Sequence, residues 1–161
     1  MSSEQYAGRS FDVVALSGVT AAGSRLLTQE LFGAGNTGQV CTGIQKMVQR
    51  WLLEFSTIRG SMPWHLSNRG TDFMLQVQQG TLRTEADVRS AYVAAAVQAR
   101  QNLTNEDTGE EPADERFDRS ALTGLAIGNG RVELYIRLYS AAGSSYDAIL
   151  PISITPANLT V

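Results

Sequence analysis

The chain has 161 residues, of which 43% are hydrophobic, and its formal net charge is −3. This length suits one domain with its own core, and the absence of any run of about 18 apolar residues excludes a membrane-spanning helix. The 13 basic residues are scattered singly along the sequence, so no basic stripe indicates a nucleic-acid partner.

The first 40 residues predict an N-terminal extension, and we place the main domain at residues 41–161. Residues 11–16 form a β-branched run typical of a strand, whereas residues 24–32 carry leucines near helical spacing, which indicates a short helix or turn. Residues 33–38 match the G-x-G-x-x-G pattern of dinucleotide-binding proteins. Because no strand leads into this pattern, we interpret it as a glycine-rich linker and expect no cofactor.

Residues 42–103 predict a helical block that is interrupted once by a loop. Apolar side chains recur every three or four residues from 44 to 58 and again from 88 to 103, which is typical of one face of an α-helix. Thr84 precedes the second run as a natural N-cap, and Asp87 follows it in the manner of a capping box. We therefore expect two long amphipathic helices that pack together.

The loop between these helices contains Pro63 and two glycines, Gly60 and Gly70, which we expect to act as hinges. Trp64 lies in the same loop, and we expect its ring to cover the helix pair. The segment that begins with Thr71 predicts a short helix capped by that residue.

The last third of the chain changes to a period of two after an acidic stretch at residues 105–114, which we interpret as a solvated loop. Residues 117–127 and 131–139 flank Gly-Asn-Gly and predict a hairpin, and residues 147–155 predict a third strand. Pro151 lacks a backbone donor and predicts an edge position for that strand. The fold class is then α+β, with two long amphipathic helices and a short helix packed on a small C-terminal antiparallel sheet.

Few residues in the sequence support catalysis. His65 is the only histidine and has no neighbouring ligands, so we expect no metal. Cys41 lies at a helix start, where its pKa could be lowered. Glu54 and Asp72 are the only carboxylates that we can nominate for a glycosidase. A structural explanation is favoured for each, Glu54 as part of the polar face of a helix and Asp72 as a first-turn acid. We therefore expect no enzyme activity.

Several short motifs occur in a recognisable order. A helix ending in Leu-Leu and Ser-Thr is followed by the glycine-bounded loop, a Thr-capped helix, an acidic turn and a closing hairpin. The residues that carry these motifs are Thr57, Gly60, Ser61, Pro63, Gly70, Glu115 and Arg116. Together they resemble the baseplate wedge or sheath-initiator proteins of contractile phage tails, a family that is called lysozyme-like in name. The resemblance covers about residues 41–155, although Ser61 and Met62 stand where the family has a charged pair.

This resemblance implies a structural virion protein that is made in the host cytoplasm and sits in six copies on the tail baseplate. Its implied partners are the tail sheath protein and the baseplate wedge proteins, with tail tube or hub proteins as further candidates. The C-terminal sheet would offer an open edge to the first sheath ring, through the arm from Phe117 or through the third strand with Ile149 and Ile152. Two alternatives stay open, a peptidoglycan hydrolase and another neck or tail-completion protein.

Overall fold

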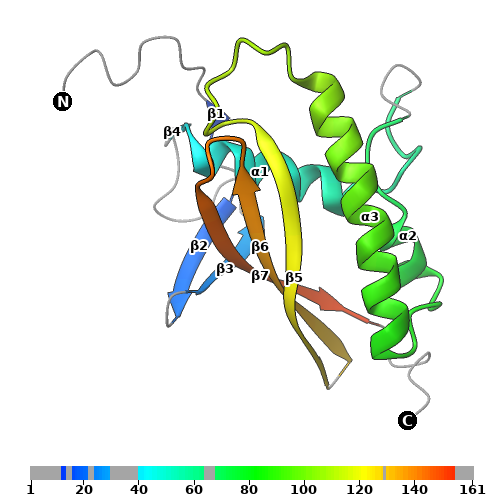
Figure 1. Cartoon of the computed structure of the whole chain (residues 1–161). Coiled ribbons are helices and arrows are strands. Elements are labelled where there is room, and N and C mark those ends of the chain that lie inside the picture. The colour runs from blue at the N-terminus through cyan, green and yellow to red at the C-terminus, as the bar shows by residue number, and fades with distance from the viewer. Residues whose placement is uncertain are drawn as a thin grey trace.

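The computed structural model describes residues 12–13, 16–21, 24–29, 40–63, 68–128 and 130–154 (Figure 1). The glycine-rich linker at 33–38, Trp64 and His65 lie outside these residues. Three helices and one five-stranded sheet make up most of the described chain, and a second sheet contains two short strands. The helices are α1 (Ile44–Ser56), α2 (Phe73–Gln78) and α3 (Glu85–Glu106). The expected α+β class is confirmed.

The five-stranded sheet has the order β2-β3-β7-β6-β5. Its strands are β2 (Leu16–Ala21), β3 (Ser24–Gln29), β5 (Phe117–Gly128), β6 (Arg131–Ser140) and β7 (Ser145–Ser153). The other sheet pairs β1 (Asp12–Val13) with β4 (Val40–Cys41). In Figure 1, α3 runs alongside β5, α2 lies on the far side of α3, and α1 crosses behind the sheet.

The two long helices form where the sequence predicts them. Thr84 accepts a hydrogen bond from the Asp87 amide, and the Asp87 carboxylate accepts one from the Thr84 amide, so the capping box is complete. The short helix begins later than predicted, at Phe73, and no side chain caps it. Thr71 is fully buried and instead donates its hydroxyl to the Phe55 carbonyl at 2.8 Å. The predicted Thr71 cap is therefore wrong, because the end of α1 already binds that hydroxyl.

The core lies between the helices and one face of the sheet. Its centre is an aromatic cluster in which the Phe55 ring is 4.8 Å from that of Trp51, 5.0 Å from Phe73 and 5.7 Å from Tyr92. Alternate residues of β6 complete it from the sheet side, namely Val132, Leu134, Ile136 and Leu138. Such alternation is what a strand with one buried face requires.

Strand β5 contains two register irregularities against β6, at Asp118 and Thr123. The second one changes the parity of the strand, because Leu122 lies opposite buried Ile136 and Leu125 lies opposite buried Leu134. An extra residue between them is what keeps both leucines on the helix-covered face.

The N-terminal strands join the C-terminal sheet, which the sequence did not indicate. Residues 24–29 form strand β3 instead of the expected helix or turn, and β3 pairs in parallel with β7 at Ala148 and Ile149. Pairing with a strand more than a hundred residues away overrides the local leucine spacing. The third predicted strand is therefore an inner strand and not an edge, which corrects the expectation from Pro151.

The ladder between β6 and β7 explains why Pro151 is tolerated there. The amide of Ile154 donates to the Gly130 carbonyl at 2.7 Å, which fixes the phase of this ladder. Because bonded and non-bonded pairs alternate along antiparallel strands, the Pro151 nitrogen faces away from β6. It therefore removes no bond to β6, and the pairing with β3 ends before it, at Ile149.

Among the described residues, none of the helices combines the length and apolar character that crossing a bilayer requires.

Candidate functional site

The loop after α1 is shaped by hydrogen bonds of Thr57, Ser61 and Thr71. Thr57 caps α1, since its amide and hydroxyl both donate to the Leu53 carbonyl. The Ser61 hydroxyl donates to the Ile58 carbonyl at 2.6 Å. The ends of the loop are then joined by a bond of 2.8 Å from the Thr71 amide to the Thr57 carbonyl. These contacts join the two ends of the loop, and Pro63 is exposed.

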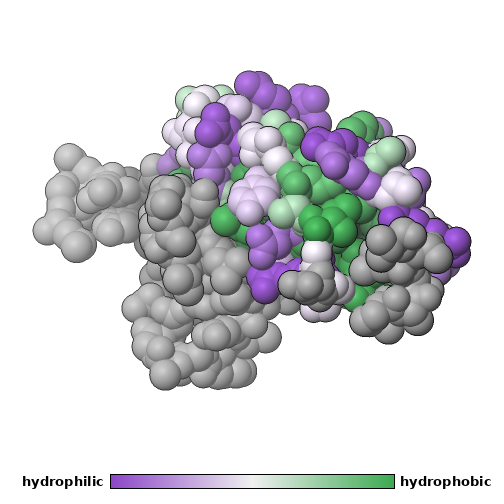
Figure 2. All heavy atoms as spheres, turned by 90° about the horizontal axis from the view of Figure 1, so that it is seen from below, coloured by the Kyte–Doolittle hydropathy of each residue, from purple (hydrophilic) through white to green (hydrophobic). Residues whose placement is uncertain are grey.

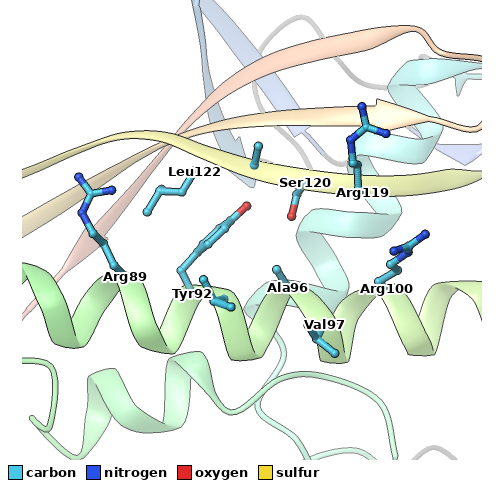
Figure 3. A pocket seen from close by; sticks show the side chains of 10 residues that line it. Arg89, Tyr92, Ala96, Val97, Arg100, Arg119, Ser120 and Leu122 are labelled. Carbon is cyan, nitrogen blue, oxygen red and sulfur yellow. The ribbon is translucent and has the colours of Figure 1, made fainter.

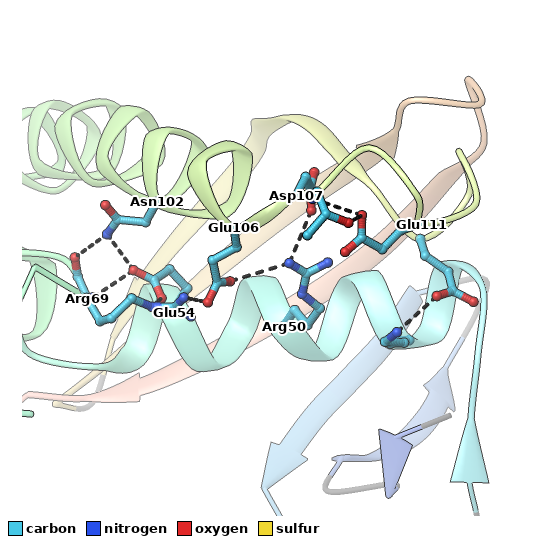
Figure 4. Close-up of polar contacts among 11 residues, drawn as sticks. Arg50, Glu54, Arg69, Asn102, Glu106, Asp107 and Glu111 are labelled. Atoms are coloured by element: carbon cyan, nitrogen blue, oxygen red, sulfur yellow. Dashed lines mark hydrogen bonds and ion pairs between the residues drawn. The ribbon is translucent and has the colours of Figure 1, made fainter. Parts of the chain in front are cut away.

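Glu54 holds this loop against both long helices (Figure 4). Only 2% of it is exposed, and its carboxylate accepts hydrogen bonds from Arg69 Nε at 2.7 Å, the Gly70 amide at 2.6 Å and Asn102 Nδ2 at 2.5 Å. The expectation of a solvent-facing Glu54 is therefore wrong. The helical period of the sequence indicates this burial, because Glu54 lies seven positions after Met47 and three after Trp51, on the buried face of α1.

The network around Glu54 continues along the surface between α1 and α3. Arg69 also forms an ion pair with Glu106, and Arg50 contacts Glu106 at 3.4 Å and Asp107 at 3.2 Å. These contacts lie between α1 and the end of α3 in Figure 4. These contacts tie α1, the loop and the end of α3 together.

Gly70→Ala should destabilise the protein far more than Gly60→Ala. Both glycines have positive φ, +89° and +79°, which L side chains rarely adopt. A Cβ on Gly70 would lie 2.5 Å from the Thr57 carbonyl oxygen, whereas one on Gly60 would meet nothing within 4 Å. We expect a loss in the free energy of unfolding of at least about 2 kcal/mol for Gly70→Ala and about 1 kcal/mol for Gly60→Ala. Urea denaturation measures both, and equal losses would contradict the close approach. The hinge role of the two glycines stays a prediction.

Glu115 forms a second buried clamp, at the start of α1. It has no exposed surface, and it accepts hydrogen bonds from Thr42 Oγ at 2.6 Å, the Gly43 amide at 3.1 Å and Lys46 Nζ at 3.0 Å. Burial alone would raise its pKa, but these donors hold the pKa of Glu115 below its usual range. The neighbouring Arg116 has a buried Nε without a hydrogen-bond partner in the described chain.

Cys41 and Asp72 are the other two residues that we considered for chemistry. Cys41 is buried, and burial raises the pKa of its thiol, so the expected lowering at the helix start is wrong. Asp72 lies at the surface and accepts from Gln98 Nε2 at 2.6 Å. No group of three or more metal-ligating side chains comes together within the described ranges.

Strand β5 is one end of the sheet, and among the described strands it pairs only with β6. The ladder phase set by Ile154 carries over from β6, so every second residue directs its N–H and C=O away from β6 within each regular run of β5, before and after Thr123. These outward-facing residues are Ser120, Leu122, Leu125 and Ile127. Of the two strands expected to be open, only β5 therefore offers this edge. Ile152 lies in the core and Ile149 lies opposite Leu26 of β3.

A groove of about 470 Å³ lies between α3 and β5, beside this edge (Figure 3). Its floor includes Tyr92 and Ser120, whose buried hydroxyls face one another. Burial raises the pKa of Tyr92 to about 12, and the Ser120 hydroxyl opposes this shift. Val93 and Val97 on the helix side are 63% and 53% exposed, although valine is usually buried.

Sequence reasoning missed this groove because its two walls are distant in the chain. The sequence of α3 nevertheless contains an indication of an exposed apolar surface. Val93 and Val97 are four residues apart, so they lie on one face of the helix, and they are not among its buried residues. Figure 2 views the molecule from the end that carries the turn between β5 and β6, and it shows hydrophobic side chains gathered between hydrophilic ones. A contiguous exposed apolar surface beside a free strand edge is typical of an interaction site.

Comparison of the chain with protein-family models, with curated proteins and with solved structures finds no match.

Proposed function

We propose that the protein is a structural component of a contractile phage tail, a baseplate wedge protein that starts sheath assembly by offering a strand edge to the first sheath ring. The observation that carries the proposal is β5, a strand of 12 residues with one open side. An open edge is a template for a strand of another chain, with main-chain hydrogen bonds providing affinity. The partner and the six-copy arrangement are what the resemblance of the motif order to the baseplate wedge family implies.

The buried clamps are consistent with a structural role. Glu54 and Glu115 each accept three hydrogen bonds and tie loops to helices, as a rigid docking scaffold requires. We do not propose a peptidoglycan hydrolase, since Glu54 is 2% exposed and saturated by donors. A general acid must reach the bond that it protonates.

Amide-resolved hydrogen exchange tests the proposed strand addition. In the free protein, the outward amides of Ser120, Leu122, Leu125 and Ile127 should exchange quickly, whereas those of Ala121, Gly124 and Ala126 are bonded to β6 and should exchange slowly. Addition of the tail sheath protein should slow the outward amides of one regular run, Ser120 and Leu122 or Leu125 and Ile127, by at least about tenfold, because each outward amide of that run gains a partner.

The inward amides of β5 provide the internal control for this experiment, since their partners do not change. Protection confined to α1 would contradict strand addition and would indicate a contact through the helix face.

A further inference from the structure

The face of α3 that borders the groove carries an arginine at each end. Arg89 and Arg100 are eleven positions apart, which is three helical turns, so they lie on the same face. Val93, Ala96 and Val97 lie between them along the groove. The resulting stripe, which we call the arginine-valine stripe, consists of Arg89, Val93, Ala96, Val97 and Arg100.

The two arginines are available to a partner. Their side chains are 48% and 58% exposed, and their present partners are Glu85 on the same helix and Asp118 at the start of β5. Ion pairs between exposed side chains are weak and exchange easily. Arg119 also borders the groove, but its guanidinium stacks on the Tyr139 ring at 4.3 Å and points away from α3 in Figure 3.

The side chains that line the groove in the described part of the chain include arginines but no acid. Glu85 and Asp118, the present partners of Arg89 and Arg100, lie just outside this lining. A partner segment with carboxylates at the two ends and an apolar centre would match this lining, because Arg binds carboxylates in a planar, bidentate manner.

The dimensions fix the spacing of those carboxylates. Eleven residues of helix span about 16 Å. In an added strand, side chains on one face recur every second residue, and positions i and i+4 are about 13 Å apart, within reach of two long arginine side chains. Positions i and i+3 would point to opposite faces of the sheet, so they could not both reach the stripe.

We propose that the strand added to β5 carries the pattern acid-x-aliphatic-x-acid, with both carboxylates bound by Arg89 and Arg100 and the aliphatic side chain packed on Val93 and Val97. This inference rests on the proposed strand addition and names the chemistry of the partner segment. Main-chain bonds to Ser120 and Leu122 then hold the strand, and the arginine-valine stripe selects its sequence.

Fluorescence anisotropy with short labelled peptides tests the pattern at low salt. The probe is Ser-Thr-Glu-Thr-Val-Thr-Glu-Thr-Ser, and the comparison peptides carry Lys for both Glu, or place the two Glu three positions apart. We expect the probe to bind at least about tenfold more tightly than either comparison peptide.

The double variant Arg89→Glu/Arg100→Glu should reverse the preference and bind the Lys peptide better. A control variant with the same change in charge is Arg59→Glu/Arg83→Glu, at two exposed sites outside the groove, and it should keep the original preference.

Equal binding of the Glu and Lys peptides, absence of binding, or indifference to Arg89→Glu/Arg100→Glu would overturn the pattern. Hydrogen exchange with the sheath protein distinguishes an error in the acidic pattern from an error in the proposed strand addition. If the sheath protein protects β5 equally in Arg89→Glu/Arg100→Glu, strand addition stands and the acidic pattern is wrong. If it protects β5 in neither protein, both proposals fail.

Discussion

Replacing Phe55 with alanine is expected to lower the free energy of unfolding by about 4 kcal/mol. The ring has no exposed surface and contacts three other aromatic rings at the centre of the core. Its removal leaves a cavity between α1, α2 and α3. The van der Waals contacts that are lost add to the free energy lost with the buried apolar surface. Urea denaturation at neutral pH measures the change.

The matched control for this experiment is Leu53→Ala, two positions earlier on α1. Leu53 is 41% exposed, so its truncation should change the free energy of unfolding by less than about 0.5 kcal/mol. Equal losses for the two variants would contradict the assignment of the α1 face that packs on the core.

Glu115→Ala should destabilise the protein by a similar amount, about 4 kcal/mol, because it removes the buried carboxylate that accepts hydrogen bonds from Lys46 Nζ and from the Gly43 amide at the start of α1. The folded-state pKa of Glu115 is depressed, so its stabilisation is fully present above the unfolded-state value of about 4.3. It is lost as the pH falls through the lower folded-state pKa. The protein should therefore lose stability below about pH 4, and Glu115→Gln should flatten this part of the curve.

Chemical denaturation at stepped pH values measures that dependence. The control is Glu110→Gln, which removes the same charge from an exposed position in the same loop and should leave the slope unchanged. If the free energy of unfolding of the wild type and of Glu115→Gln fell in parallel below about pH 4.3, the usual carboxyl pKa, Glu115 would not be the source of the pH dependence.

Local patterns were sufficient to predict the elements whose stability is local. The capping box at Thr84 needs only residues 84–87, and the alternation of β6 needs only its own sequence. By contrast, β3 is a strand because it pairs with β7, and no pattern within residues 24–29 predicts that pairing. Long-range pairing decided against the local leucine spacing there.

The candidate site was harder to predict than the fold for the same physical reason. The sequence indicated two possible open strands, and pairing of β7 with β3 leaves β5 as the one with its outward side open. Glu54 is buried by donors that lie 15 to 48 positions further along the chain, so its environment follows from tertiary contacts alone. The groove beside β5 likewise exists only once α3 is placed against that strand.

The irregularity at Thr123 limits how strongly one copy of the protein can hold a partner. It divides the open side of β5 into two short regular runs, so an added strand forms about four main-chain hydrogen bonds with either run. At about 1 kcal/mol each, these bonds barely offset the loss of translational and rotational freedom on association, which is about 4 kcal/mol or more. A single attachment would then dissociate readily. Six attachments on one ring raise the effective concentration at each unoccupied position, so avidity would hold the complete ring while isolated partner subunits are released.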